Sequence, residues 1–351
     1  METKCGNRVY VQWHITEQCG NNCRHCYSKG KRILCETSLL DFKAMLLDIV
    51  SLGNRWGRSV QITLIGGDPL LHPNFLDFVD IINEYKNTRI IIAGNPETLT
   101  PKVIERLIPK IYAFQVSVDG IGEIHDWFRY QGSYKKTIAK IKEATKMGLR
   151  MHCMTTVSDK NVDQLEEIML AVYRAGVSLW AFARYVPPVG SPTELDWQKY
   201  QQALARVEKA HKPFELAGYG PQKKDPLWYP FKNSEPCLTD NPNRCQIDGC
   251  GIGSPTFGIL PDNTVMACRR HAGSNLGIWK ESGDILRLLV SSSVITQLRK
   301  LENIESCKNC KYLYHCRGCR AIAFSVKGNI FDPDPACPIL KMKGGINYAR
   351  D

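Results

Sequence analysis

The stretch Glu17–Gly30, EQCGNNCRHCYSKG, carries three cysteines, at positions 19, 23 and 26, near the start of the chain. An odd number of neighbouring cysteines cannot all pair as disulfides, and the polar stretch Met1–Gln12 before them has none of the features of a secretory signal. The spacing C-x3-C-x2-C, in a loop rich in Gly and Asn, therefore predicts ligands of a metal ion or cluster.

The composition favours a reducing compartment. The chain has 351 residues, 43% of them hydrophobic, and fifteen cysteines, a high number for an intracellular protein of this length. The odd number, without a secretory signal, argues against a disulfide framework. The apolar runs are strand-sized and too short to span a membrane, so a cytoplasmic location and no membrane partner are expected.

The charge balance is basic, with a formal net charge of +11. Such a balance favours an anionic partner, such as an acidic peptide or a carboxylate-rich small molecule, although a mildly basic surface with no specific partner explains the same number. No run of basic residues is dense enough to mark a nucleic-acid site, so nucleic acid is not an expected partner.

From about residue 9 to residue 190 the chain alternates between strand-like segments, rich in Val, Ile and aromatic residues, and segments with apolar residues at helical spacing. The predicted strands are Val9–Thr16, Val60–Ile65, Arg89–Ala93, Ala113–Val118, Arg150–Val157 and Ser178–Val186. The predicted helices are Ser38–Leu52, Asn74–Glu84, Pro101–Leu107, Ser133–Met147 and Val162–Ala175. Six such units are fewer than the eight of a closed barrel, so the predicted fold is α/β, an open (β/α)6 TIM-like partial barrel.

The composition changes after residue 190 and divides the chain. A helix is predicted at Thr193–Ala210, which completes a core domain over residues 1–212. Residues 213–236, rich in Pro, Gly, Lys and aromatic residues, are interpreted as a linker. Residues 237–351 hold nine cysteines and only short strand-like segments, which predicts a small cysteine-rich C-terminal domain organised by metal.

The first three cysteines follow directly on the first predicted strand, at the end of the strand where barrels of this kind keep their active sites. Three thiolates on a cubane [4Fe–4S] cluster leave one iron open for a substrate or cofactor. The alternative is a zinc site completed by a distant fourth ligand.

The sequence CGNNCRHCY (Cys19–Tyr27) resembles the signature of radical S-adenosylmethionine (SAM) enzymes. In that family the open iron binds the amino and carboxylate groups of SAM. One electron from the cluster cleaves SAM to methionine and a 5′-deoxyadenosyl radical, which abstracts a hydrogen atom. The resemblance implies that Cys19, Cys23 and Cys26 hold such a cluster.

Two further stretches resemble parts of the same family. ITLIGGDPLLHP (Ile62–Pro73) is similar to its Gly-Gly-Glu-Pro motif, with Asp68 in place of Glu, where backbone carbonyls accept hydrogen bonds from the methionine ammonium. FARYVPPVGS (Phe182–Ser191) resembles the end of the sixth strand, where the family cradles adenine. The resemblance implies SAM-binding roles for Gly66, Gly67, Asp68 and Pro69.

The stretch QVSVDGIGEIHDWFR (Gln115–Arg129) resembles the family's fourth strand and the loop after it. Ser117 and Asp119 alternate with two valines, so they share one face, which is expected to point into the barrel. The resemblance implies that Ser117 hydrogen-bonds the methionine or ribose of SAM, that Asp119 belongs to the same site, and that Arg129 pairs with the carboxylate. The alternative for Arg129 is a surface ion pair with Asp126. No acid or base catalyst is identified.

The C-terminal cysteines form a second pattern, in which CKNCKYLYHCRGC (Cys307–Cys319) is followed by DPDPACP. Two C-x2-C pairs would suit one zinc ion, but nine cysteines are more than one zinc site needs. The arrangement resembles the SPASM extension of radical SAM enzymes, with Asn263 in a Gly position and one gap shorter by a residue. It implies two auxiliary clusters, three [4Fe–4S] clusters in all. The implied ligands are Cys245, Cys250, Cys268 and Cys319 for one auxiliary cluster, with Cys237 as the alternative to Cys245, and Cys307, Cys310, Cys316 and Cys337 for the other. Cys5, Cys35 and Cys153 are expected to be ordinary thiols.

The resemblance implies that the enzyme modifies a ribosomally made peptide or small protein, by a thioether or carbon–carbon crosslink, epimerisation or backbone excision. Formylglycine formation is disfavoured, because Arg269 follows Cys268 where sulfatase-maturing relatives carry Asp. The first alternative is modification of a tetrapyrrole side chain, which HCRGCRA also resembles. The alternative of another class is a non-catalytic iron–sulfur or zinc protein, an electron carrier or adaptor on the same scaffold.

Partners follow from the same resemblance. A strand that begins at Val9 leaves no room for a domain that grips a leader peptide, so either a separate protein supplies that function or the barrel binds the substrate directly. Arg269, Arg270 and His271 are candidates for holding an acidic peptide. An electron donor such as flavodoxin or ferredoxin is also expected.

Overall fold

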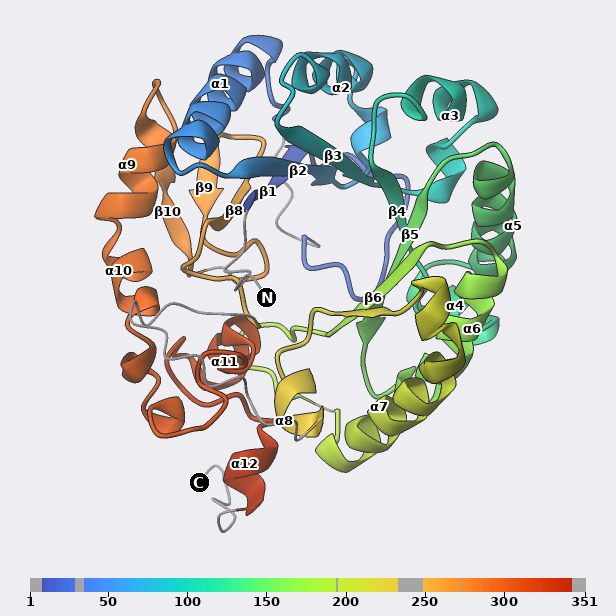
Figure 1. The fold of residues 1–351 in the computed structure, drawn as a ribbon, viewed down its shortest axis with the longest axis vertical. Coiled ribbons are helices and arrows are strands. Elements are labelled where there is room, and N and C mark those ends of the chain that lie inside the picture. Colours follow the sequence, from blue (N-terminus) through green and yellow to red (C-terminus); the bar gives the residue numbers. More distant parts are fainter. Residues whose placement is uncertain (1–7, 29–34, 194, 233–248, 272, 343–351) are drawn as a thin grey trace.

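A computed structural model of the chain describes residues 8–28, 35–193, 195–232, 249–271 and 273–342. Its centre is a ten-stranded sheet in the order β10-β9-β8-β1-β2-β3-β4-β5-β6-β7. The sheet curves into an incomplete barrel, and the helices α1 to α7 lie on its outer side (Figure 1). The predicted open (β/α)6 architecture is confirmed.

Six parallel strands make up the barrel wall. They are β1 (Arg8–Thr16), β2 (Ser59–Gly66), β3 (Thr88–Ala93), β4 (Ala113–Ser117), β5 (Met151–Val157) and β6 (Leu179–Arg184). The helices between them are α1 (Leu39–Arg55), α2 (Phe75–Asn83), α3 (Pro101–Leu107), α4 (Glu123–Phe128), α5 (Ser133–Lys146) and α6 (Leu165–Arg174). Short 3-10 turns stand at η1 (Pro69–Leu71), η2 (Pro96–Thr98) and η3 (Val162–Gln164). The sequence did not predict α4, which is too short to show a helical period.

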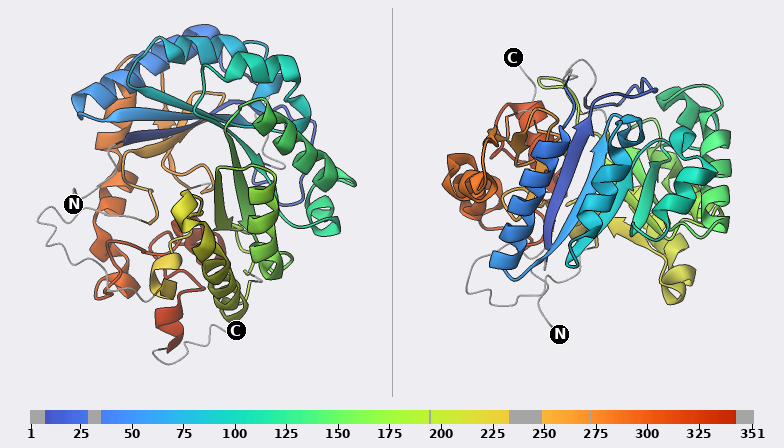
Figure 2. Two further views of the ribbon diagram at one scale, coloured as in Figure 1. Left: turned by 45° about the vertical axis from the view of Figure 1, so that its right-hand side comes forward. Right: turned by 90° about the horizontal axis from the view of Figure 1, so that it is seen from above.

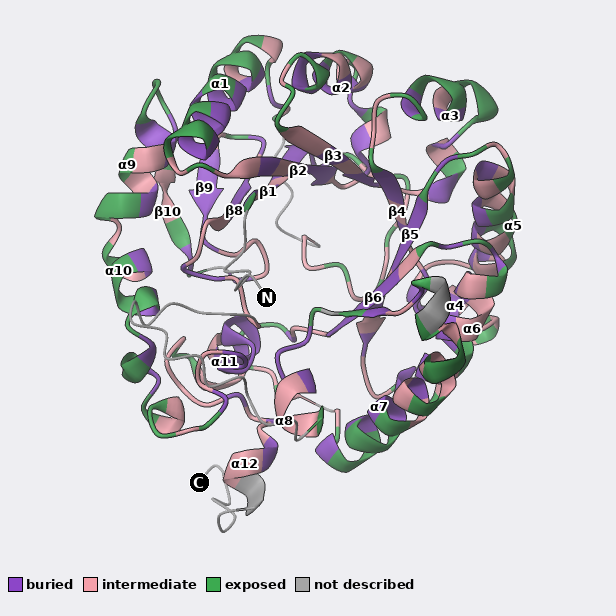
Figure 3. Ribbon diagram, in the orientation of Figure 1, coloured by how far each residue is buried: buried purple, intermediate pink, exposed green. Residues whose placement is uncertain are grey.

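The outer face of the sheet forms the core with the helices, as the buried strands and inward helix faces in Figure 3 show. In α1, Ser38 caps the first turn by accepting a hydrogen bond from the Asp41 amide at 3.0 Å. Phe42 then stacks on Trp13 of β1 and on Phe78 of α2, with ring centroids 4.2 and 4.0 Å apart. Burial of these rings holds β1, α1 and α2 together.

Helix α7 (Trp197–His211) starts later than predicted, because the Asp196 carboxylate caps it by accepting a hydrogen bond from the Lys199 amide. The segment after this helix, which was predicted to be a linker, contains regular structure. A 3-10 turn, η4 (Lys212–Ala217), leads to β7 (Pro221–Lys223), which pairs in parallel with β6 as an edge strand, and α8 (Trp228–Lys232) follows. Proline is tolerated at such an edge, because its missing N–H faces away from the ladder.

The cysteine-rich segment continues the same sheet on the other side. Strand β8 (Thr256–Ile259) pairs in parallel with β1, and β9 (Thr264–Met266) and β10 (Asn275–Ile278) follow antiparallel. The remaining elements are α9 (Asp284–Ser291), α10 (Ser293–Arg299), η5 (Leu301–Asn303), η6 (Glu305–Cys307), α11 (Arg320–Lys327) and α12 (Pro338–Met342). This segment lies beside β1 and α1 (Figure 2). The predicted domain limits stay predictions, and the sheet runs across them.

Asp48 of α1 is buried and joins the core helix to the C-terminal segment. Its carboxylate accepts hydrogen bonds from the Gly283 and Ile285 amides, both at 3.0 Å, and from the Trp279 indole at 3.2 Å. The acid therefore satisfies the amides at the start of α9. Within the described ranges, no helix is both long and apolar enough to cross a membrane.

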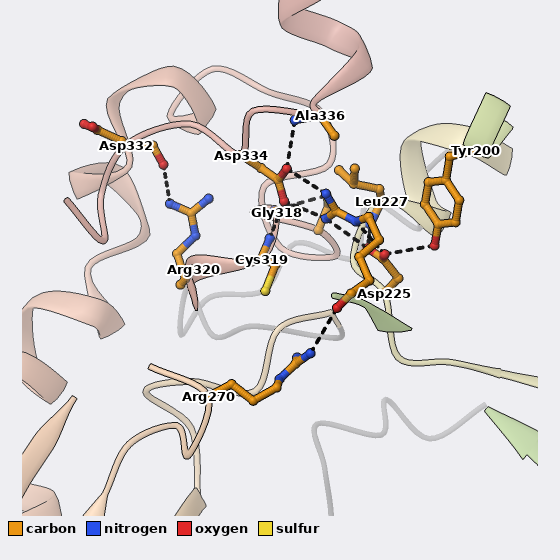
Figure 4. Close-up of polar contacts among 12 residues, drawn as sticks. Tyr200, Asp225, Leu227, Arg270, Gly318, Cys319, Arg320, Asp332, Asp334 and Ala336 are labelled. Carbon is orange, nitrogen blue, oxygen red and sulfur yellow. Dashed lines mark hydrogen bonds and ion pairs between the residues drawn. The ribbon is translucent and has the colours of Figure 1, made fainter. Parts of the chain in front are cut away.

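Arg184, at the end of β6, makes the second connection. Its guanidinium donates to Asp225 at 2.6 and 3.2 Å and to Asp334 at 2.9 and 2.7 Å, and all three side chains are buried. Asp225 also accepts from the Tyr200 hydroxyl at 2.9 Å, and Asp334 from the Cys319 amide at 2.7 Å (Figure 4). One cation thus ties the barrel wall to β7–α8 and to the cysteine-rich segment.

Replacing this cation while keeping its bulk should destabilise the protein strongly. Arg184→Met leaves two buried carboxylates without their partner, so we expect a loss of about 3–5 kcal/mol in the free energy of unfolding, measured by urea denaturation. The matched control is Arg206→Met, which removes an exposed arginine from its pair with Asp163 and should cost less than about 1 kcal/mol. Equal losses in the two variants would contradict this role for Arg184.

Candidate cluster and cofactor site

The first three cysteines lie in the loop that leaves β1 at the carboxyl end of the barrel. Gly66, the last residue of β2, and Gly67 pack against this loop. A Cβ on Gly66 would lie 1.9 Å from the Thr16 carbonyl oxygen, and one on Gly67 would lie 2.2 Å from that of Gln18. Their close approach lets the Gly67 amide donate to Thr16 at 2.9 Å and the Asp68 amide to Gln18 at 2.7 Å. Only glycine allows this contact, which holds the start of the cysteine loop.

Asp68 is fully buried and organises the next loop. Its carboxylate accepts from the Thr98 hydroxyl at 2.8 Å, from the Leu70 amide at 3.3 Å and from the Asn95 amide at 3.4 Å. The Asn95 side chain then donates to the Cys19 thiol at 3.5 Å. Burial raises the pKa of Asp68, although these donors oppose the shift. The side chain of Asp68 therefore positions the Cys19 loop, and Pro69, which is buried, begins the turn η1.

Asp119 and Arg129 form a buried ion pair at the end of β4. The Arg129 Nε and Nη2 atoms donate to Asp119 Oδ2 at 3.0 and 2.8 Å, and Asp119 Oδ1 accepts from the Thr156 amide at 2.9 Å. Burial alone would raise the pKa of Asp119, but Arg129 and His25 hold it well below its usual range. The remaining nitrogen, Arg129 Nη1, lies 3.8 Å from the Cys23 thiol.

The alternative partner for Arg129 is wrong. Asp126 instead accepts hydrogen bonds from the Gly132 and Tyr134 amides, at 2.7 and 2.8 Å. Ser117 is half-buried at the end of β4, while Val116 and Val118 are buried in the core. This alternation is the one expected of a strand with one face on the helices.

The surroundings of the three thiols suit an anionic cluster. Cys19 and Cys23 are half-buried and Cys26 is exposed. Besides the Asn95 and Arg129 donors, the Asn21 amide donates to the Cys19 thiol at 3.4 Å. Burial raises the pKa of Cys23, and Arg129 opposes the shift. N–H donors and a cation around sulfur stabilise the negative charge of an iron–sulfur cluster, so the donor set fits such a group.

A row of polar residues joins this loop to the C-terminal segment, and of these only Arg269 was predicted from the sequence, as a candidate for holding an acidic peptide. His14 Nδ1 lies 3.0 Å from the Glu17 carboxylate, and His14 Nε2 lies 3.3 Å from the Tyr27 hydroxyl. Arg269 donates to the same hydroxyl, and its guanidinium lies 4.8 Å from the centroid of the Tyr27 ring. Burial raises the pKa of Tyr27 to about 12, so the phenol stays neutral. The one sequence signal was the position of Tyr27, directly after Cys26.

Four C-terminal cysteines line one cavity. Arg317 and Asp334 also lie in its wall. The structure thus brings together one of the two implied ligand sets: Cys307, Cys310, Cys316 and Cys337. Four thiols around one space fit a cubane, whose four irons each take one thiolate.

Three cysteines of the other implied set are neighbours. Cys268 packs against the apolar cluster that contains Cys319, and the charge of Cys250 affects the pKa of both thiols. Cys245 lies outside the described residues, as do Cys237 and Cys5. Cys153 is buried in the core and Cys35 is exposed, as ordinary thiols would be.

Among the described residues, no three His, Cys, Asp or Glu side chains lie close enough together to share a single metal ion. A cubane spreads its thiolates over four irons, so this finding does not bear on it.

The comparisons with known proteins agree with the fold. The model of the radical SAM superfamily matches residues 13–172. The chain is 24% identical over 355 residues to the AdoMet-dependent heme synthase of Methanosarcina barkeri, an alignment that covers 93% of this chain and 95% of that one. It is 25% identical over 183 residues to the pre-heme d1 synthase of Dinoroseobacter shibae, covering 50% of this chain and 43% of that one.

Two kinds of solved structure share the fold along almost the whole chain. Streptococcus suis SuiB bound to S-adenosylmethionine has a TM-score of 0.73 at 13% identity, covering 94% of this chain and 77% of that one. The anSMEcpe enzyme with bound AdoMet has a TM-score of 0.73 at 15% identity, covering 93% and 90%. The barrel, its cysteine loop and the superfamily match lead to one conclusion: residues 13–172 form a radical SAM domain.

Proposed function

We propose that Cys19, Cys23 and Cys26 hold the [4Fe–4S] cluster of this radical SAM enzyme, with SAM bound beside it at the carboxyl ends of β2 and β4. The observation that carries the proposal is the cysteine loop itself, which is held by backbone contacts and surrounded by N–H donors. When bound, the cluster and SAM would supply the 5′-deoxyadenosyl radical of the family.

Each predicted SAM ligand has a separate task in this proposal. Gly66, Gly67 and Pro69 shape the backbone that meets the methionine end, and Ser117 offers a half-buried hydroxyl to the methionine or ribose. Arg129 uses Nε and Nη2 on Asp119, which leaves Nη1, beside Cys23, for a carboxylate. Asp119 and Asp68 act as positioning residues, because protein donors occupy their oxygens.

Two auxiliary clusters complete the proposal. The cavity lined by four cysteines supports the first of them, and the neighbouring Cys250, Cys268 and Cys319 support the second. Cys245, or Cys237 in its place, supplies the fourth thiolate of that second cluster. An electron donor of the flavodoxin or ferredoxin type would reduce the clusters.

For the substrate, we propose a ribosomally made peptide. Two features support it: a barrel left open on one side can admit a chain laterally, and the protein carries a net charge of +11 that suits acidic groups. Among structures with the same fold, SuiB has been solved bound to its precursor peptide SuiA, and anSMEcpe with peptides. A separate protein that binds the leader peptide is part of this proposal.

A tetrapyrrole acid is the second candidate. It is favoured by the heme synthase of M. barkeri, which aligns along 93% of the chain. Its carboxylates would suit the same cations, so the two candidates share the chemistry of carboxylate recognition and differ in the bond that is changed.

Removing the three thiols of the first loop should abolish SAM cleavage. A variant with Cys19, Cys23 and Cys26 all changed to Ala should form no 5′-deoxyadenosine with SAM and dithionite. Its iron content after anaerobic reconstitution should fall from about twelve to about eight per chain, by the four-iron stoichiometry of each cubane. A control with Cys35→Ala, an exposed thiol, should match the wild type. Deoxyadenosine from the triple variant at the wild-type rate would contradict the proposal.

Breaking the Asp119–Arg129 pair should weaken SAM binding. Asp119→Asn keeps the shape but removes the charge that orients Arg129, so we expect the Kd for SAM to rise about tenfold or more, since each 1.4 kcal/mol is a factor of about ten. Equilibrium binding to the reconstituted protein measures this. Asp126→Asn is the matched control, because Asp126 only accepts from two amides nearby. The same Kd in both variants would exclude the role.

The substrate class can be decided by mass spectrometry. The enzyme, SAM and reductant are incubated with the peptide encoded beside its gene and, in a separate reaction, with a porphyrinogen-type acid. We expect a mass change in the peptide together with stoichiometric 5′-deoxyadenosine. A mass change in the tetrapyrrole alone would overturn the peptide in favour of the second candidate.

A further inference from the structure

Two arginines of the C-terminal segment are buried without carboxylate partners. Arg317 is 3% exposed and Arg320 is 1% exposed. Neither takes part in any ion pair among the described residues. Arg317 Nε, and Nε and Nη2 of Arg320, are buried atoms that have no hydrogen-bond partner within the described part of the chain. A buried guanidinium in such surroundings is costly unless an anion lies beside it.

Arg317 stands between the two sets of C-terminal cysteines. It lines the cavity that Cys307 and Cys316 share with the other two thiols of their set. Its Nη2 atom donates to the backbone carbonyl of Cys250, which belongs to the other set. The guanidinium is therefore within reach of both places where a cluster would be held.

Arg320 is the first residue of α11 and directly follows Cys319. Its Nη1 atom donates to the carbonyls of Ile330 and Asp332, at 2.9 and 2.7 Å, which holds the side chain in place (Figure 4). Its Nη2 atom lies against Gly318 in the wall of the cavity, 3.0 Å from where a Cβ on that glycine would stand. The two free nitrogens thus belong to a side chain that is already oriented.

The backbone at Arg317 is also strained. Its φ is +62°, a left-handed conformation that residues other than glycine rarely adopt, and Gly318 follows with the same φ. The strained backbone and the buried charge of Arg317 both lower the stability of the folded protein. Strain of this kind is typically retained where a function depends on it. Glycine would adopt this conformation without strain, so the backbone geometry by itself does not explain an arginine here.

We propose that Arg317 and Arg320 tune the auxiliary cluster held by Cys307, Cys310, Cys316 and Cys337, by placing two cations against it. A cubane with four thiolates is negative, and reduction makes it more so, so nearby cations and N–H donors raise its reduction potential. Because Arg317 also contacts Cys250, its charge acts at the boundary between the two clusters. This inference rests on the proposed auxiliary clusters.

The test is a redox titration followed by electron paramagnetic resonance. It uses the full-length chain in the background with Cys19, Cys23 and Cys26 changed to Ala, so that only auxiliary clusters contribute. Arg317→Gln removes the charge and keeps a donor, and Arg317→Gly also removes the backbone strain and guards against misfolding. We expect one of the two midpoint potentials to shift to a more negative value in both variants, with iron content unchanged. Arg320→Gln should shift the same signal.

Arg287→Gln is the matched control, because it removes an equal charge from a side chain that is 63% exposed in the same segment. It should leave both potentials unchanged. Unchanged midpoint potentials in all Arg317 and Arg320 variants would overturn the inference. Loss of about four irons per chain from both Arg317 variants would also overturn it, because Arg317 would then be needed for assembly of the cluster. The metal content of the background chain is measured before any arginine is changed. An iron content near zero, with zinc bound, would overturn the proposed auxiliary clusters themselves.

Discussion

The arrangement of this protein depends on one buried cation shared by two carboxylates. Arg184 ends the sixth barrel strand, Asp225 follows β7 and Asp334 lies in the cysteine-rich segment, 150 residues away along the chain. Burial alone would lower the pKa of Arg184, but the two carboxylates raise it well above its usual value, so the guanidinium stays charged. The last strand, the segment after it and the C-terminal cysteines are therefore held in one geometry by a contact whose partners cannot be removed singly without cost.

The same connection links two functional regions. Asp334 accepts from the Cys319 amide and lies in the wall of the four-cysteine cavity, so the ion pair reaches both sets of C-terminal thiols. On the opposite edge of the barrel, β8 pairs with β1, and Arg269 reaches the Tyr27 hydroxyl in the first cysteine loop. The C-terminal segment is thus attached to the barrel at both edges of its opening.

Three buried acids in this molecule pair with arginines. Asp119 has Arg129, and Asp225 and Asp334 share Arg184, so these buried acids have matched cations. The exceptions stand at the cysteines, where Arg317 and Arg320 have surplus donors among the described residues, and Arg129 keeps one nitrogen beside Cys23. Cations in excess next to sulfur are what an anionic iron–sulfur group requires of its surroundings.

The sequence by itself determined the six strand–helix units and the position of the first cysteine loop. Both are local properties: buried residues recur with the period of their element, and the spacing of Cys19, Cys23 and Cys26 needs only a loop after a strand. The Gly-Gly pair was also visible, although its contact with Thr16 and Gln18 was not, because nothing in the composition says which backbone lies opposite.

Only the tertiary structure decided the rest. The pairing of Arg129 with Asp119 in place of Asp126, and that of Arg184 with Asp334, depends on how distant segments close on each other. The additions of β7 and β8 to the barrel sheet depend on free strand edges, and these exist only once the six-stranded wall has formed. Local patterns specify the elements, whereas buried charges and sheet edges acquire partners only when the chain has folded.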